Sequence, residues 1–125
     1  MVSIIANIYN MNRKIVFYRL GNGESPVEEF LDTLPDKAAQ KVIAVFKVIE
    51  ENLIVSTRFF KKLTGTEIWE CRIMWQSDIY RILGFFEKNN FIILTNGFHK
   101  KTQKTPTSEI KRAEEYMKDY KRRNS

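Results

Sequence analysis

The side chains best suited to chemistry in this 125-residue chain are cations on or beside predicted strands. Arg72 and Arg81 fall within two strand patterns, and Lys61 and Lys62 precede the first of them. A basic run, residues 99–105, follows the last predicted strand and reads His-Lys-Lys-Thr-Gln-Lys-Thr. Arginine can hold a phosphate through two parallel hydrogen bonds, and lysine offers a mobile point charge. This set of residues favours a phosphate-rich or otherwise acidic partner.

Arg81 has two interpretations, because it lies on an otherwise apolar face of its predicted strand. An arginine is almost never fully buried without a partner. Arg81 must therefore pair with a carboxylate across the strand pair, such as Glu70, or reach an open cleft. Arg72 alternates with Glu70 and projects from the face opposite Trp69 and Trp75. We expect this face to be the wetter one.

The basic run and the other reactive residues also have more ordinary interpretations. Lys100, Lys101 and Lys104 fit a solvated surface run as well as they fit a phosphate site. His99 could exchange a proton near neutral pH, although a lone histidine at a strand end is usually a surface or packing residue. Cys71 shares the tryptophan-bearing face and is interpreted as a small core residue rather than a reactive thiol.

Several kinds of chemistry find no support in the sequence. One cysteine and one histidine leave too few ligands for a zinc site, and a single cysteine excludes an internal disulfide. The chain has no glycine-rich phosphate loop, no paired metal carboxylates and no nucleophile elbow. We therefore expect neither a metal nor another cofactor.

Positive charge is concentrated near the C-terminus. The formal net charge is +6, yet residues 1–98 hold 12 basic and 11 acidic side chains, whereas residues 99–125 hold 9 and 4. Such a field attracts acidic partners without specifying a reaction. With 43% apolar residues the chain can build the core of one domain. Its apolar stretches are too short to span a membrane and its start lacks signal-peptide features, so we expect a cytoplasmic protein without membrane contact.

The hydrophobic pattern also predicts the elements that position these residues. Strands are expected at 14–20, 68–75, 79–87 and 91–98. Helices are expected at 26–34, at 36–51 and from about 106 onward. The core-facing stripe of the second helix is expected to consist of Ala39, Val42, Ile43, Phe46 and Ile49. Together they predict one α+β domain over residues 14–125, a small curved antiparallel sheet with helices packed on one side. Residues 1–13 are either an N-terminal lead or an extra strand.

The order and wording of four segments carry a family resemblance. The segments are residues 25–31 (SPVEEFL), 62–72 (KLTGTEIWECR), 80–83 (YRIL) and 97–106 (GFHKKTQKTP). Over about residues 14–120 the chain resembles the HigB-like branch of the RelE/ParE toxin superfamily, whose members are often described as phage-derived. The last segment is the most specific part of the likeness. The resemblance implies a compact RelE-like domain.

The resemblance implies the toxin of a type II toxin–antitoxin system, acting in the cytoplasm on ribosomes that carry mRNA in the A site. The implied activity is a ribosome-dependent endoribonuclease, in which a ribose 2′-OH attacks the adjacent phosphorus without a metal. A cognate helix-turn-helix antitoxin, HigA-like, is implied as partner, with operator DNA bound only through that antitoxin. The ParE side of the superfamily implies a different function, non-enzymatic inhibition of DNA gyrase, and the sequence leaves this alternative open.

Residue roles follow from the same resemblance, position by position. The implied catalytic residues are Arg72, Arg81, Lys100, Lys101 and His99. The implied RNA contacts are Gln103 and Lys104. Lys61 and Lys62, which are cations beside the predicted sheet, are expected to bind RNA as well. The arginines would clamp the scissile phosphate, the lysines would stabilise charge or donate a proton, and the histidine would serve as a general acid or base. The group that removes the 2′-OH proton stays open, with Glu70 as one candidate.

Overall fold

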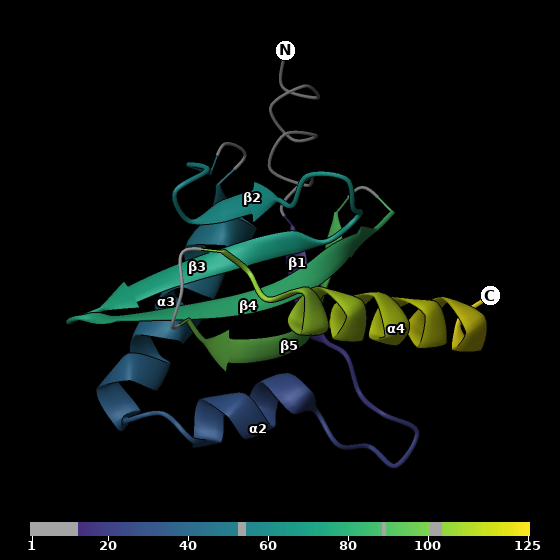
Figure 1. The fold of residues 1–125 in the computed structure, drawn as a ribbon, viewed down its shortest axis with the longest axis horizontal. Helices are drawn as coiled ribbons and strands as arrows, with labels where there is room; N and C mark the ends of the chain where they lie inside the picture. The colour runs from purple at the N-terminus through teal and green to yellow at the C-terminus, as the bar shows by residue number, and fades with distance from the viewer. Residues whose placement is uncertain (1–12, 53–54, 89, 101–103) are drawn as a thin grey trace, which may run out of the picture.

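The computed structural model describes residues 13–52, 55–88, 90–100 and 104–125, and its centre is a five-stranded sheet against which three helices pack (Figure 1). The strands are β1 (Lys14–Phe17), β2 (Phe60–Lys62), β3 (Trp69–Trp75), β4 (Asp78–Glu87) and β5 (Phe91–His99). The helices are α2 (Pro26–Asp32), α3 (Asp36–Glu51) and α4 (Thr107–Arg123). This arrangement confirms the α+β class. Of the predicted N-terminal lead, residues 1–12 lie outside the described residues. No helix in the described ranges is long and apolar enough to cross a membrane.

Local sequence signals set the start of α2 and the bounds of the meander strands, whereas β1 ends at Phe17, three residues before its predicted end. Ser25 caps α2, since its side-chain oxygen accepts a hydrogen bond from the backbone N–H of Glu28 at 3.2 Å, and Pro26 occupies the first helical position. The three meander strands begin and end within one residue of the predicted bounds. The short strand β2 was not predicted, because three residues are too few to display an alternating pattern.

The sheet is mixed rather than wholly antiparallel. Its strand order is β1-β5-β4-β3-β2, and β1 runs parallel to β5, with Ile15 opposite Ile92. The other neighbouring strands are antiparallel. Parallel neighbours need a long crossover connection, which α2, α3 and the strands that follow them provide between β1 and β5.

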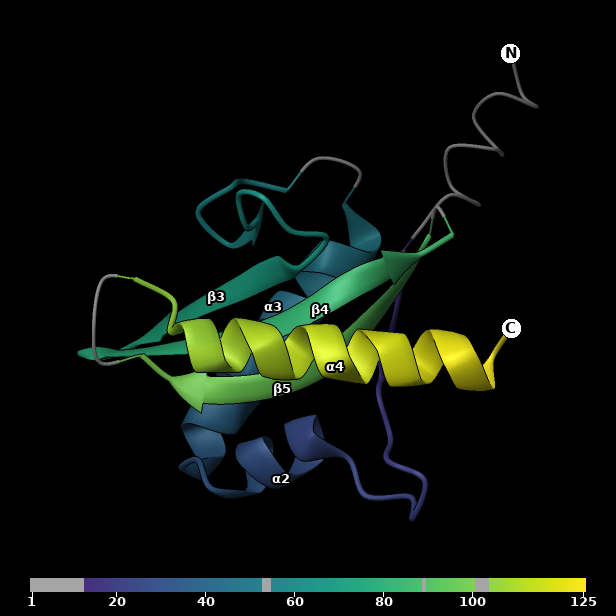
Figure 2. The same cartoon turned by 45° about the vertical axis from the view of Figure 1, so that its right-hand side comes forward.

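Helices cover both faces of the sheet, which corrects the one-sided arrangement predicted from the sequence. The first core, on the side of α2 and α3, includes Val27, Val42, Phe46, Ile73, Ile82 and Ile92. The second core, under α4, includes Tyr18, Leu83, Phe85, Ile93, Ala113 and Met117. Consecutive residues of β4 and β5 thus alternate between the two cores, as Figure 2 illustrates with α4 in front of the sheet and α3 behind it. Because both faces of these central strands are apolar, both must be covered.

The buried side of α3 is rotated relative to the predicted stripe. It consists of Ala38, Val42, Val45, Phe46 and Ile49. Ile43, expected inside, is 49% exposed, and Ala39 is only half-buried. The apolar residues of this helix extend around more than one narrow stripe, so helical spacing alone permits either orientation, and the packing of α3 against the sheet selects one.

Hydrogen bonds at its two ends hold α4 on the sheet. Near its start, the Asn96 side-chain amide donates to the Glu109 carboxylate at 3.2 Å. Near its end, the Tyr18 hydroxyl donates to the Asp119 carboxylate at 2.5 Å. Because α4 is held at both ends, it covers a fixed part of the sheet and leaves the rest of that face open.

Gly84 lies at a bulge between β4 and β5, where a side chain does not fit. A Cβ atom there would lie 2.5 Å from the carbonyl oxygen of Ile93 and 2.9 Å from Cδ2 of Leu94. We expect Gly84→Ala to lower the free energy of unfolding by about 1–3 kcal/mol, because the backbone must shift to relieve the overlap. Urea unfolding measures this loss. Gly21→Ala, with no atom within 4 Å of its Cβ, serves as control, and equal stability of the two variants would contradict the prediction.

Candidate active site

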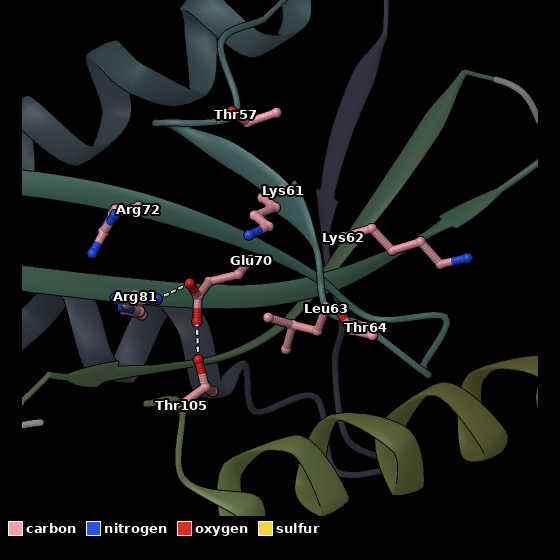
Figure 3. A pocket seen from close by; sticks show the side chains of 9 residues that line it. All are labelled: Thr57, Lys61, Lys62, Leu63, Thr64, Glu70, Arg72, Arg81 and Thr105. Atoms are coloured by element: carbon pink, nitrogen blue, oxygen red, sulfur yellow. Dashed lines mark hydrogen bonds and ion pairs between the residues drawn. The ribbon is translucent and has the colours of Figure 1, made fainter. Parts of the chain in front are cut away.

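A cleft opens on the face of the sheet that carries α4, beyond the part that the helix covers (Figure 3). Its volume is about 250 Å³, and strands β2, β3 and β4 and the segment leading into α4 contribute to it. The lining residues are Thr57, Lys61, Lys62, Leu63, Thr64, Glu70, Arg72, Arg81 and Thr105. Four of these nine side chains are cationic and one is acidic, so the cleft carries net positive charge.

The pairing register of the strands brings three cations and one carboxylate onto the same face. Lys61 lies opposite Glu70 in the β2–β3 pair, and Arg72 lies opposite Arg81 in the β3–β4 pair. Alternate residues of a strand point to the same side, so all four side chains face the cleft. Like charges directly opposite each other are destabilising, so the two arginines need a nearby anion. Glu70 supplies one negative charge.

Glu70 binds two partners, one on each carboxylate oxygen. Its Oε1 accepts a hydrogen bond from Nη1 of Arg81, and its Oε2 accepts one from the Thr105 hydroxyl (Figure 3). Both charged residues are buried, with Arg81 5% and Glu70 6% exposed. Burial lowers the pKa of the Arg81 guanidinium, which stays protonated at neutral pH all the same. The pairing of Arg81 with Glu70 is therefore confirmed, and Arg81 also lines the open cleft.

Three buried nitrogen atoms, two of them on arginines that line the cleft, have no hydrogen-bond partner among the described residues. They are Nε of Arg72, Nε of Arg81 and Nζ of Lys100. A buried donor without a partner costs free energy on the order of 1–3 kcal/mol, so such groups call for an explanation. Lys100 continues the β5 ladder through a bond from its N–H to the carbonyl oxygen of Ile79, which places its side chain on the face of Arg81. Donors with unused capacity on one face are suited to binding an anion.

His99 lies apart from these cations. It pairs with Tyr80 across the β4–β5 ladder, and the Tyr80 side chain belongs to the core on the opposite face of the sheet. Its ring lies 5.2 Å from the ring of Tyr80, and its Nε2 is 2.9 Å from Oδ1 of Asp78. The structure thus brings Lys61, Arg72, Arg81 and Lys100 onto one face but does not bring His99 there.

The other residues predicted to contact RNA do not point into the cleft beside Glu70 or lie outside the described residues. Lys62 lines the cleft, but its register opposite Trp69 turns the side chain away from Glu70, as Figure 3 shows. Lys104 is exposed and immediately precedes Thr105, which lines the cleft. Lys101 and Gln103 lie outside the described residues.

Thr105 is the functional candidate that sequence reasoning missed. It stands at the end of the basic run, directly before Pro106, and nothing in its local pattern marks it as a bonding partner of Glu70. The two residues are 35 positions apart, so their contact depends on the tertiary fold. The sequence shows only that Thr105 carries a hydroxyl group and follows a cluster of cations, which does not indicate a bond to Glu70.

Cys71 is buried in the first core, and burial raises the pKa of its thiol to about 12. The thiolate is the reactive form, so we expect the native protein to resist the thiol reagent DTNB at pH 8 and to react fully in urea. A Ser77→Cys variant places a thiol in an exposed turn and serves as the reactive control. Rapid labelling of native wild type would show that this side of the sheet opens readily.

The arrangement can hold a phosphate and stabilise negative charge that develops on it. Lys61, Arg72 and Arg81 supply positive charge at one face. The N–H groups that no described residue binds supply donors, and both are required for electrostatic stabilisation of a reacting phosphoryl group. Glu70 already accepts a bond at each oxygen and serves to hold Arg81. Within the described ranges, no group of three or more His, Cys, Asp or Glu side chains could hold a metal ion.

Comparison with known proteins identifies the family of this chain. A family model described as phage-derived protein Gp49-like (DUF891) matches residues 29–118. This range contains strands β2 to β5 and most of α4, but not β1. No curated protein matches the chain. The matched family is associated with the toxins of toxin–antitoxin systems, which implies an antitoxin partner. The chain belongs to the Gp49-like family of phage-derived proteins, within the RelE/HigB-like toxins.

Proposed function

We propose that this protein is the toxin of a type II toxin–antitoxin system, of the HigB-like kind, and that it cleaves mRNA on the ribosome in the cytoplasm. The observation that carries the proposal is the cationic cleft, in which Arg72 and Arg81 lie side by side. Each has a buried Nε–H group without a partner in the described part of the chain. Two adjacent guanidinium groups share a cleft that is lined by only one carboxylate, so they can bind a second anion. The RNA backbone offers a phosphate at every nucleotide.

The proposed reaction is an internal transfer within the RNA chain. The 2′ oxygen of a ribose attacks the adjacent phosphorus, and the bond from phosphorus to the 5′ oxygen of the next nucleotide breaks. The products are a 2′,3′-cyclic phosphate and a free 5′-hydroxyl. The 2′-OH proton passes to a base, and the leaving 5′ oxygen takes up a proton from a donor. Negative charge builds on the phosphoryl oxygens as the new bond forms.

The described residues divide this work between charge stabilisation and positioning. Arg72 and Arg81 bind the phosphoryl oxygens, and Lys61 adds positive charge from β2. The Lys100 ammonium, on the same face, is a candidate donor for the leaving oxygen. Glu70 is better suited to hold Arg81 than to remove the 2′-OH proton, because both of its oxygens are engaged. The proposal gives His99 no part in the reaction, since its side chain lies across the sheet.

The proposed partners follow from family membership. A helix-turn-helix antitoxin of the HigA-like kind would neutralise the toxin, and operator DNA would be bound through that antitoxin. The basic run at residues 99–105, which contributes to the excess positive charge near the C-terminus, would favour the approach of the protein to ribosomal RNA.

The proposal is tested with purified protein on ribosomes programmed with a defined message. We expect cleavage of the message only when it is engaged on the ribosome, with a 5′-hydroxyl and a cyclic phosphate at the new ends. A message with a 2′-deoxynucleotide at the mapped site lacks the attacking group and should stay intact. If neither message is cut while induced cells still stop growing, the nuclease is refuted. Induction of DNA damage signalling with intact messages would instead support inhibition of DNA gyrase.

A further inference from the structure

The connection between β5 and α4 is tied to the floor of the cleft by one hydroxyl group. Thr105 Oγ1 donates to Oε2 of Glu70, whose other oxygen accepts from Nη1 of Arg81. The three residues come from the connection, from β3 and from β4, so this chain of hydrogen bonds ties the connection to a strand pair that lies far from it in the sequence. All three line the cleft (Figure 3).

The way in which Glu70 holds Arg81 is unusual for a buried pair. Carboxylate and guanidinium groups often pair through two parallel hydrogen bonds, which use both oxygens and two nitrogens. Here only Nη1 of Arg81 bonds to Glu70, and Nε of Arg81 is buried without a partner among the described residues. The second oxygen of Glu70 points toward Thr105 and accepts the bond from its hydroxyl, so it is turned away from the Arg81 fork (Figure 3).

We propose that Thr105 is a positioning residue that limits Glu70 to a single hydrogen bond with Arg81 and so leaves the Nε–H of Arg81 for the RNA phosphate. This inference rests on the proposed function. Without the hydroxyl, Oε2 of Glu70 loses the donor that bonds to it among the described residues. The Nε–H of Arg81 belongs to the guanidinium that already bonds to Oε1, and it is an unused donor. The carboxylate then turns and accepts two hydrogen bonds from Arg81. The guanidinium is left with fewer free N–H donors for the substrate phosphate.

The variants that test this role differ by single groups. Thr105→Val keeps the size and branching of the side chain but removes the hydroxyl, whereas Thr105→Ser keeps the hydroxyl. We expect Thr105→Val to lower kcat for message cleavage on the order of 10- to 100-fold, the cost of a misplaced catalytic group, and Thr105→Ser to stay within about threefold of wild type. Thr107→Val, at an exposed position on α4 outside the cleft, is the matched control and should cleave like wild type.

A second measurement does not depend on cleavage. The Nε–H signal of Arg81 is followed by ¹⁵N NMR while a short 2′-O-methylated RNA, which cannot be cut, is added. The wild-type signal should shift on binding, whereas in Thr105→Val it should already differ in the free protein and respond little to the RNA. A wild-type signal that does not respond to bound RNA overturns the inference, even if Thr105→Val fails to fold.

The two proposals fail in distinguishable ways. If wild type does not cleave programmed messages, the nuclease is refuted and the NMR titration alone decides whether Thr105 controls the Arg81 fork. If wild type cleaves and Thr105→Val cleaves equally well, or if Thr105→Ser is as impaired as Thr105→Val, the nuclease stands and the role of Thr105 is refuted.

Discussion

Replacement of Arg72 by alanine is expected to lower the rate of message cleavage by a factor on the order of 10²–10³. Arg72 lies on the cleft face directly opposite Arg81, and its buried Nε has no hydrogen-bond partner among the described residues. Its Nε–H therefore has donor capacity that no described residue uses. Because Arg72 forms no ion pair within the described residues and its loss removes a buried donor without a partner there, the free energy of unfolding should fall by no more than about 1 kcal/mol.

Two further variants sharpen this test. Arg72→Lys keeps the charge but loses the planar fork, so we expect an intermediate rate. Arg122→Ala removes a cation that is 76% exposed and that pairs with Asp119 on α4, and should cleave like wild type. Cleavage rates at saturating programmed ribosomes, with urea unfolding of each variant, provide the measurement. An Arg72→Ala protein that cleaves at the rate of Arg122→Ala would exclude a role for Arg72 in the reaction.

Replacement of Arg81 by methionine is expected to reduce both stability and activity. The change leaves the Glu70 carboxylate buried without its cation, which typically costs about 3–5 kcal/mol. Cleavage should also be lost, since the Arg81 fork is gone. The double variant Glu70→Leu with Arg81→Met replaces the pair by apolar side chains and should recover most of the lost stability, because no unpaired charge remains. It should stay inactive.

The comparison between single and double variants separates structure from chemistry at this site. Arg19 and Glu28 form an exposed ion pair, with side chains 51% and 48% exposed, and provide the matched control. Arg19→Met should change the free energy of unfolding by less than about 1 kcal/mol. If Arg81→Met lowered the free energy of unfolding no more than Arg19→Met does, the buried Glu70 carboxylate would not need Arg81 to stabilise its negative charge. Cleavage by the double variant would show that Arg81 has only a structural role.

The two arginines thus differ in what holds them, although they face each other across one strand pair. Arg81 is fixed by a buried carboxylate, which itself is fixed by Thr105. Arg72 has no such partner in the described part of the chain and is only half-buried. We expect Arg81 to supply a preorganised position and Arg72 to supply an adaptable one, so that substrate binding orders Arg72 more than Arg81.

Sequence patterns predicted the meander strands and the start of α2, because alternation, turn residues and a capping serine act over a few residues. The pairing of Arg81 with Glu70 was one of two expected outcomes, since a cation at an apolar strand position needs a partner across the pair. The positions of Arg72 and Lys61 on the cleft face also follow from strand alternation once the register is known.

Other features depended on contacts between segments far apart in the chain. The parallel pairing of β1 with β5, the placing of α4 on the face opposite α3, and the rotation of α3 that exposes Ile43 are choices that no local pattern makes. His99 could be recognised as a possible proton donor, but only the register with Tyr80 placed it across the sheet from the arginines. The bond from Thr105 to Glu70 joins residues 35 positions apart and left no mark in either segment.

The sequence by itself determined which residue types this protein brings to its chemistry, the strands that carry them and the family to which the chain belongs. These properties are encoded within short segments, by side-chain period, capping and turn residues. Only the tertiary structure decided which cations share one cleft and which donors remain without partners. Those outcomes depend on strand register and on which face each helix covers, and both are set by the packing of the whole chain.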